Sequence, residues 1–133
     1  MKEVLDTRFF VELFYSKKTE SRKKTRDKII KLSKDREGIV PSIVLAELVK
    51  VICEKHGKDE ARIAHLSVVR SGLEIVPITS DLARDAGLIG CRYKKLPMGD
   101  CIITATAVKA KAIVVTDDPH FDEIKEVSRT WIK

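Results

Sequence analysis

The acidic residues that could do chemistry in this sequence stand beside apolar segments, not among other polar residues. They are Asp6, Glu47, Asp100 and the neighbouring pair Asp117 and Asp118. A carboxylate with apolar neighbours is costly to bury unless a partner or a cation offsets its charge. If these acids meet in the fold, with no matching set of basic or histidine side chains, they form an oxygen-only site of the kind that Mg²⁺ and Mn²⁺ prefer.

Such a site predicts metal-assisted hydrolysis of a phosphodiester. One bound ion would lower the pKa of a water molecule and hold it in line for attack, and a second would stabilise the leaving oxygen. Whether one ion or two bind is left open by the sequence, because four acids bind metal weakly until a substrate phosphate completes the coordination. The chain carries 26 Lys and Arg against 20 Asp and Glu, a net charge of +6. This charge would attract the nucleic-acid backbone that the bare acids repel.

Each of these features also has an ordinary explanation. Asp6 and Asp100 are both placed to cap a helix, Glu47 could face water on an amphipathic helix, and Asp117 could begin an Asx turn. The charged fraction of 35% is also typical of a thermophile's surface. Taken together, however, the acids favour a site, because a cap or a turn needs no acidic partners.

Short apolar strands alternate with helical patterns along the whole chain. We predict strands over 3–7, 38–42, 73–78, 112–116 and 127–132, and helices over 7–15, 17–36, 42–56, 59–71, 79–93 and from Gly99 to about 107. This alternation predicts an α/β fold, a three-layer α/β/α sandwich with a parallel sheet, in a single domain of residues 1–133. In such sheets the site lies at the carboxyl ends of the strands, which is where Asp6 and the acidic pair fall.

Two of the predicted helices carry distinctive side chains. In 7–15, Phe9, Phe10 and Phe14 recur at helical spacing and offer more apolar surface than one small sheet covers, which predicts a protein interface. The segment 17–36 is strongly basic and predicted to be exposed, either as a solvated face or as a surface for RNA or an acidic partner. Its candidate RNA-binding residues are Lys23, Lys24 and Lys28.

Cysteine usage and hydropathy bear on the compartment. The three cysteines, Cys53, Cys91 and Cys101, show no C-x-x-C spacing, so they indicate neither a disulfide framework nor a zinc site. The first residues do not resemble a signal peptide, and no apolar run approaches the ~20 residues that span a bilayer. We therefore expect a soluble cytoplasmic protein with no membrane association.

Together the motif residues resemble a PIN domain. They are Asp6-Thr7 after the first strand, Glu47-Leu48 within a helix, Asp100 in the pattern Asp-x-x-Ile-x-Ala-x-Ala, and Thr116-x-Asp118 after a buried strand. Each motif is weak alone, but their order and spacing cover the whole chain. The size of the chain is similar to that of the VapC-type toxins of prokaryotic toxin–antitoxin pairs.

This resemblance implies a Mg²⁺- or Mn²⁺-dependent endoribonuclease that cleaves single-stranded RNA. It implies a Rossmann-like sheet of strand order 3-2-1-4-5, a homodimer, and a small antitoxin protein that blocks the site by laying a helix in a groove. The implied catalytic acids are Asp6, Glu47, Asp100 and Asp118; of these, Asp6, Asp100 and Asp118 would bind metal, supported by Thr7, Thr116 and Asp117. The family's Thr-x-Asp spacing selects Asp118 over Asp117, and His120 is assigned no catalytic role.

Two other functions stay open at this point. A PIN-like fold can serve as an RNA- or protein-binding scaffold without turnover, and a PIN nuclease can process RNA on its own, without an antitoxin. A phosphotransferase of the haloacid dehalogenase type is disfavoured, since its second Asp would have to stand where Arg8 is found.

Overall fold

The computed structural model describes residues 1–132; residue 133, the last of the predicted domain, lies outside the described residues. Its sheet has five parallel strands in the order β3-β2-β1-β4-β5, which confirms the predicted fold and strand order. The strands are β1 (Glu3–Leu5), β2 (Gly38–Pro41), β3 (Glu74–Val76), β4 (Ile113–Val115) and β5 (Arg129–Thr130). The helices are α1 (Thr7–Tyr15), α2 (Thr19–Asp35), α3 (Ser42–His56), α4 (Lys58–Val69), α5 (Ser80–Arg92), α6 (Met98–Ala110) and the 3₁₀ helix η1 (Pro119–Glu123).

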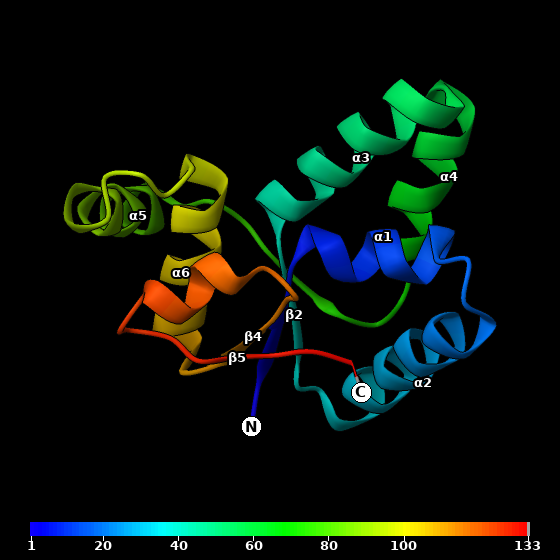
Figure 1. The fold of residues 1–133 in the computed structure, drawn as a ribbon, viewed down its shortest axis with the longest axis horizontal. Coiled ribbons are helices and arrows are strands. Elements are labelled where there is room, and N and C mark those ends of the chain that lie inside the picture. The colour runs from blue at the N-terminus through cyan, green and yellow to red at the C-terminus, as the bar shows by residue number, and fades with distance from the viewer. Residues whose placement is uncertain (133) are drawn as a thin grey trace.

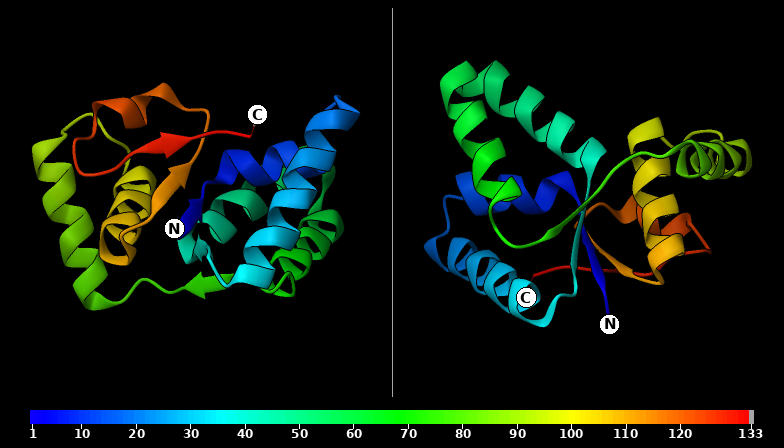
Figure 2. Two further views of the ribbon diagram at one scale, coloured as in Figure 1. Left: turned by 90° about the horizontal axis from the view of Figure 1, so that it is seen from below. Right: turned by 180° about the vertical axis from the view of Figure 1, so that it is seen from behind.

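Helices cover both faces of the sheet. In Figure 1, α1, α2, α3 and α4 lie on one side of the strands, and α5 and α6 lie on the other. The two further views in Figure 2 show the same division. Within these layers, α6 packs against β1, β2 and β4, while α2 and α3 contact β2. The strands are therefore enclosed between helices, as in a three-layer sandwich.

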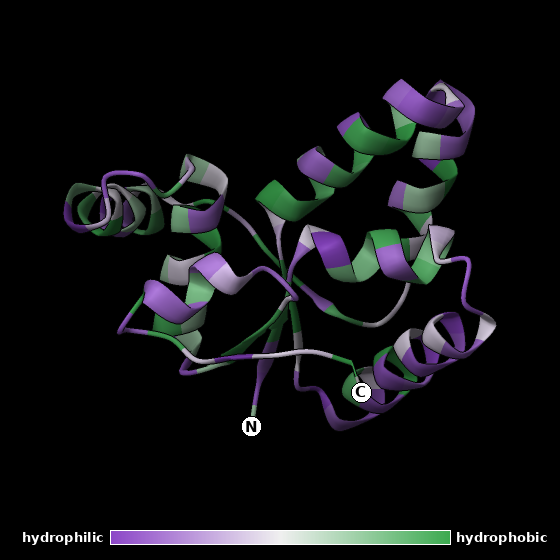
Figure 3. Ribbon diagram, viewed as in Figure 1, coloured by the Kyte–Doolittle hydropathy of each residue, from purple (hydrophilic) through white to green (hydrophobic). Residues whose placement is uncertain are grey.

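The central strands are apolar on both faces. Val4, Leu5, Val40, Val114 and Val115 have no exposed surface, and Figure 3 shows the hydrophobic colour gathered on these strands while much of α2 is hydrophilic. Continuous apolar strands are typical of a parallel sheet that is covered on both sides. None of the helices in residues 1–132 is both long enough and apolar enough to cross a membrane.

Most helix boundaries follow local sequence signals. α3 ends at Gly57, whose φ of 93° favours glycine, and the hydroxyl of Thr79 caps α5 by accepting a hydrogen bond from the N–H of Leu82. α3 begins at Ser42, and α6 begins at Met98, one residue before Gly99. In both cases an extended proline occupies the cap position.

The aromatic residues of α1 turn inward. Phe9 and Phe10 have no exposed surface, and their rings meet edge to face with centroids 5.3 Å apart. The prediction that they form a protein interface was therefore wrong, and only Phe14 of that set is partly exposed. The sheet alone does not cover α1, but α2 and α3 also pack against it.

Phe10→Ala should lower the free energy of unfolding by about 3–5 kcal/mol, because it leaves a cavity in a packed core. Urea denaturation followed by circular dichroism measures this loss. Ile30→Ala is the control, since Ile30 is 61% exposed, and it should change the free energy by less than about 0.5 kcal/mol. Equal effects of the two substitutions would contradict the placement of Phe10 in the core.

Candidate active site

The pairing of β1 with β4 sets the centre of the site. Leu5 stands opposite Val115 in the parallel register, so Asp6 and Thr116 follow at the same level. The hydroxyl of Thr116 donates to Oδ2 of Asp6 over 2.8 Å and accepts from the backbone N–H of Asp118 over 3.1 Å. One hydroxyl therefore holds both the Asp6 carboxylate and the backbone of Asp118, which gives the Thr-x-Asp spacing a physical reason.

Asp6 is almost fully buried, with 4% of its surface exposed. Its Oδ1 accepts a hydrogen bond from the N–H of Thr7 over 2.7 Å, so it does cap α1 in addition to bonding Thr116. Burial raises the pKa of Asp6; the two hydrogen bonds oppose this rise, and the charges of Glu47 and Asp118 add to it. Asp6 is thus a helix cap and a member of an acidic cluster at once.

Glu47 reaches the same place from α3. Its Oε1 accepts a hydrogen bond from the Thr7 hydroxyl over 2.7 Å, and the residue is half-buried. The alternative in which Glu47 simply faces water does not hold. Gly99 of α6 lies directly against it, because a Cβ at that position would be 2.5 Å from Oε2 of Glu47. The absence of a side chain at Gly99 lets α6 approach this carboxylate.

Asp100 shares the electrostatic environment of the other three acids. Burial, followed by the charges of Asp6, Asp118 and Glu47, raises the pKa of Asp100 to about 6, and the charge of His120 opposes the rise. Carboxylates influence one another in this way only when they lie close together. The structure therefore brings all four predicted catalytic acids to one edge of the sheet.

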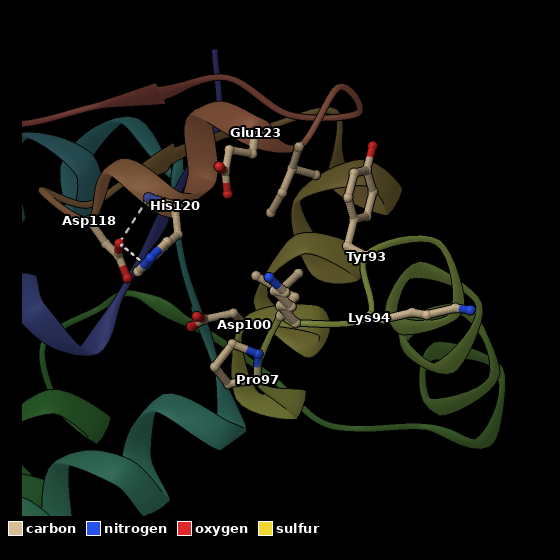
Figure 4. A pocket seen from close by; sticks show the side chains of 10 residues that line it. Tyr93, Lys94, Pro97, Asp100, Asp118, His120 and Glu123 are labelled. Carbon is tan, nitrogen blue, oxygen red and sulfur yellow. Dashed lines mark hydrogen bonds and ion pairs between the residues drawn. The ribbon is translucent and has the colours of Figure 1, made fainter.

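A cavity of about 760 Å³ opens beside Asp100 and Asp118. Its walls are the connection between α5 and α6, residues 93–97, and the segment 118–124 that contains η1. Figure 4 shows Asp118 and His120 on the η1 side and Asp100 on the α6 side of this cavity. Oδ1 of Asp118 accepts a hydrogen bond from the backbone N–H of His120 over 2.9 Å, and the ring Nδ1 of His120 lies 2.9 Å from the same oxygen.

Asp117 is turned away from this cavity. Its carboxylate accepts two hydrogen bonds from the guanidinium of Arg8, one of them between Nη2 and Oδ2 over 3.2 Å. Asp118, in contrast, lines the cavity together with Asp100. Of the two neighbouring acids, the structure thus joins Asp118 to the cluster and pairs Asp117 with a surface cation.

The predicted RNA-binding lysines on α2 are not part of this site. Nζ of Lys28 pairs with Oε1 of Glu3 over 2.7 Å at the start of β1, the opposite end of that strand from Asp6. Lys24 pairs over 3.4 Å with a glutamate one turn earlier in α2, and Lys23 is exposed on the same helix. Among the described residues, those that line the cavity do not include these three lysines.

The four acids fit a hard divalent cation in chemistry, although they do not enclose one as they stand. Carboxylate oxygens are the ligands that Mg²⁺ and Mn²⁺ prefer. Burial raises the pKa values of Asp6 and Asp100 most, and the charges of neighbouring acids raise them further; a cation would offset this negative charge. Within residues 1–132, however, no three His, Cys, Asp or Glu side chains form a group that could hold a metal ion. Ligation would therefore require the side chains to close in.

Some contacts around the acids were not predicted from the sequence, including that of His120 with Asp118. His120 had a usable signal, because Asp118-Pro119-His120 is typical of an Asx turn that directs the His120 N–H back to the carboxylate. Lys94 and Lys95, which line the cavity, had no such signal. Nothing in the sequence indicates that the connection between α5 and α6 borders the acids.

Comparison with known proteins gives a consistent result. The family model described as the PIN domain matches residues 4–127. Solved structures with this fold include a chain of VapBC2 from Rickettsia felis bound to a promoter DNA fragment (TM-score 0.79, 20% identity, 100% of each chain covered). Others come from a toxin–antitoxin complex of Klebsiella pneumoniae (0.67, 23%, 95% of each chain) and from VapC20 of Mycobacterium tuberculosis, a sarcin-ricin loop cleaving toxin (0.75, 17%, 93% of this chain and 95% of that one). Curated protein sequences give no match.

Asp100→Asn should stabilise the metal-free protein at neutral pH. Folding raises the pKa of Asp100 from its ordinary value of 3.8 to about 6, so the folded chain binds this proton more tightly than the unfolded chain. The stability that Asp100 contributes is therefore complete below about pH 4 and is lost as the pH rises through 6. Allowing for solvent screening of a partly exposed group, the advantage of the variant should grow by about 1–2 kcal/mol over this range and then level off.

The measurement is urea unfolding in EDTA between pH 4 and pH 8, with Asp27→Asn as the control. Asp27 is exposed on α2, so its substitution should shift stability equally at all these pH values. A pH dependence of Asp100→Asn that matches that of the wild type would contradict the raised pKa of Asp100 in the folded chain.

Proposed function

Because the chain belongs to the PIN domain family, we propose that it is a divalent-metal-dependent endoribonuclease that cleaves single-stranded RNA. The observation that carries the proposal is the convergence of Asp6, Glu47, Asp100 and Asp118 at one edge of the sheet. Burial, followed by the charges of the other three acids, raises the pKa of Asp100 to about 6. Mg²⁺ or Mn²⁺ is the proposed cofactor, and Asp6, Asp100 and Asp118 are its proposed ligands. The net charge of +6 supports an anionic substrate.

The chain's own residues have distinct tasks in this proposal. When bound, the divalent ion supplies positive charge that lowers the pKa of an attacking water and offsets the charge of the phosphodiester. Thr116 fixes the orientation of Asp6, and Thr7 fixes that of Glu47, each through a hydroxyl hydrogen bond. These two hydrogen bonds limit the orientations that the Asp6 and Glu47 carboxylates can adopt, which favours the geometry needed for the reaction once metal is bound.

We further propose that the protein is the toxin of a toxin–antitoxin pair. Support comes from the fold, which is shared over 95% of both chains with a protein from a toxin–antitoxin complex. Further support comes from an apolar groove between α1, α2 and α4, whose lining includes Leu13, Phe14 and Ile30. Such a groove suits the apolar face of a partner helix. Homodimer formation and a cytoplasmic location stay predictions.

A scaffold without turnover is the second candidate function. It would require no particular acids at the edge of the sheet, and it would not need Thr7 and Thr116 to orient two of them. The raised pKa of Asp100 makes the acidic cluster costly to the folded state. A costly arrangement of this kind is typical of a catalytic site, so the nuclease is favoured.

Asp6→Asn, Asp100→Asn and Asp118→Asn should each slow RNA cleavage by roughly a hundredfold or more, equivalent to about 3 kcal/mol of activation free energy. Each substitution removes a charged ligand while keeping the shape of the side chain. The measurement is cleavage of a labelled single-stranded RNA with Mn²⁺ or Mg²⁺, and EDTA should stop the reaction. Circular dichroism verifies that the variants fold.

Asp117→Asn is the matched control, since Asp117 pairs with Arg8 outside the cavity, and it should retain most of the activity. Undiminished cleavage by Asp6→Asn and Asp100→Asn would contradict the assignment of the acids. Loss of cleavage in Asp117→Asn, with activity kept in Asp118→Asn, would show that the wrong neighbour was chosen.

A further inference from the structure

The cavity beside the acids has one wall that the proposed catalytic residues do not use. This wall is the connection between α5 and α6, from Tyr93 to Pro97, and it faces the η1 segment across the opening. It is the wall that carries two neighbouring lysines, Lys94 and Lys95, both exposed. The acids repel a polyanion, whereas lysines beside them attract one.

The connection that carries the lysines is well anchored at both ends. The hydroxyl of Tyr93 donates to Oε1 of Glu126 over 2.5 Å and accepts from the N–H of Lys125 over 3.1 Å. Tyr93 also accepts, through its backbone carbonyl, a hydrogen bond from the N–H of Leu96 over 2.9 Å, which closes a turn around the lysines. At the other end Pro97 leads directly into α6. The backbone of the lysines is thus held in place relative to the acids of the cavity.

Neither lysine is occupied by an acid of the chain itself. Within residues 1–132, the ion pairs do not include Lys94 or Lys95. Other cations near the site are already committed: Arg8 pairs with Asp117, and Arg129 pairs with Asp122. The charges of Lys94 and Lys95 are therefore the ones available to a ligand that enters the cavity from this side.

We propose that Lys94 and Lys95 bind a phosphate of the RNA strand that neighbours the phosphate to be cut. The inference rests on the proposed nuclease function and adds a substrate subsite to it. Figure 4 shows the side chain of Lys94 extending away from Asp100, so its ammonium group is placed to meet the flanking backbone and not to neutralise the acids. The nucleotide between the two phosphates lies in the cavity, where the ring of Tyr93 offers a stacking surface.

This subsite is separate from the predicted RNA contact on α2. Lys28 is paired with Glu3 at the far end of β1, so a strand bound there would not bring a phosphate to Asp6. A strand held by Lys94 and Lys95 passes directly over Asp100 and Asp118, because all four residues line one cavity. Phosphate contacts of this kind position a strand without reading its sequence.

The test is the affinity of the full chain for a fluorescein-labelled oligouridine, measured by fluorescence anisotropy in EDTA over a series of salt concentrations. The double variant Lys94→Gln/Lys95→Gln should bind about tenfold more weakly. The slope of log affinity against log salt should become shallower by about 0.7, the value expected for the loss of one phosphate contact on a single strand. Lys94→Arg/Lys95→Arg should keep the wild-type affinity. The control Lys55→Gln/Lys58→Gln removes the same charge from exposed positions where α3 ends and α4 begins and should change neither quantity.

The outcomes separate the subsite from the nuclease function. If the wild type binds and cuts RNA while the Lys94→Gln/Lys95→Gln variant binds as tightly as the wild type, the subsite is overturned and the nuclease proposal stands. The subsite is also overturned if the control variant loses as much affinity as the test variant, because the effect would then be one of overall charge. If the wild type neither binds nor cuts RNA, the proposed function fails and the subsite fails with it.

Discussion

The burial of the Asp6 carboxylate at the end of the central strand is the constraint on which the rest of the structure depends. A charged group that is 4% exposed must have polar partners, and the chain supplies them from the first turn of α1 and from the residue that follows β4. These two hydrogen bonds lock the register of β1, β4 and α1 at one point. The two hydrogen bonds do not fully offset the effect of burial on the pKa of Asp6, and the nearby charges of Glu47 and Asp118 raise that pKa further.

The surplus negative charge connects the fold to the proposed chemistry. Three layers of structure converge on Asp6: α3 supplies Glu47, α6 supplies Asp100, and the segment after β4 supplies Asp118. Gly99 permits this convergence by leaving room for Glu47. A divalent cation would relieve the repulsion among the acids, and the lysines of the connection between α5 and α6 would bring the polyanionic substrate to it. The buried acids lower the stability of the folded state at neutral pH, and the same acids are the proposed ligands of a divalent cation.

The sequence predicted the parts of this site that depend on local pattern. The apolar runs that end in acids identified the strands, because that signal is carried by neighbouring residues. The choice of Asp118 over Asp117 came from the resemblance to the PIN domain through its Thr-x-Asp spacing, and in the structure the Thr116 hydroxyl accepts a hydrogen bond from the N–H of Asp118. Contacts between segments that are distant in the sequence could not be predicted in this way. The burial of Phe9 and Phe10 depends on α2 and α3 packing over α1, and the need for glycine at position 99 depends on where Glu47 points. Neither feature can be predicted from the neighbouring residues in the sequence.

The four acids form the proposed divalent-cation site, which is organised around Asp6. Isothermal titration of Mn²⁺ into the full chain at neutral pH, in the absence of RNA, tests it most directly. We predict that the wild type and the Asp117→Asn variant bind Mn²⁺, weakly but saturably, and that Asp6→Asn and Asp100→Asn lose this binding while keeping their fold. Binding that persists unchanged in Asp6→Asn, or no saturable binding by the wild type, would contradict the account.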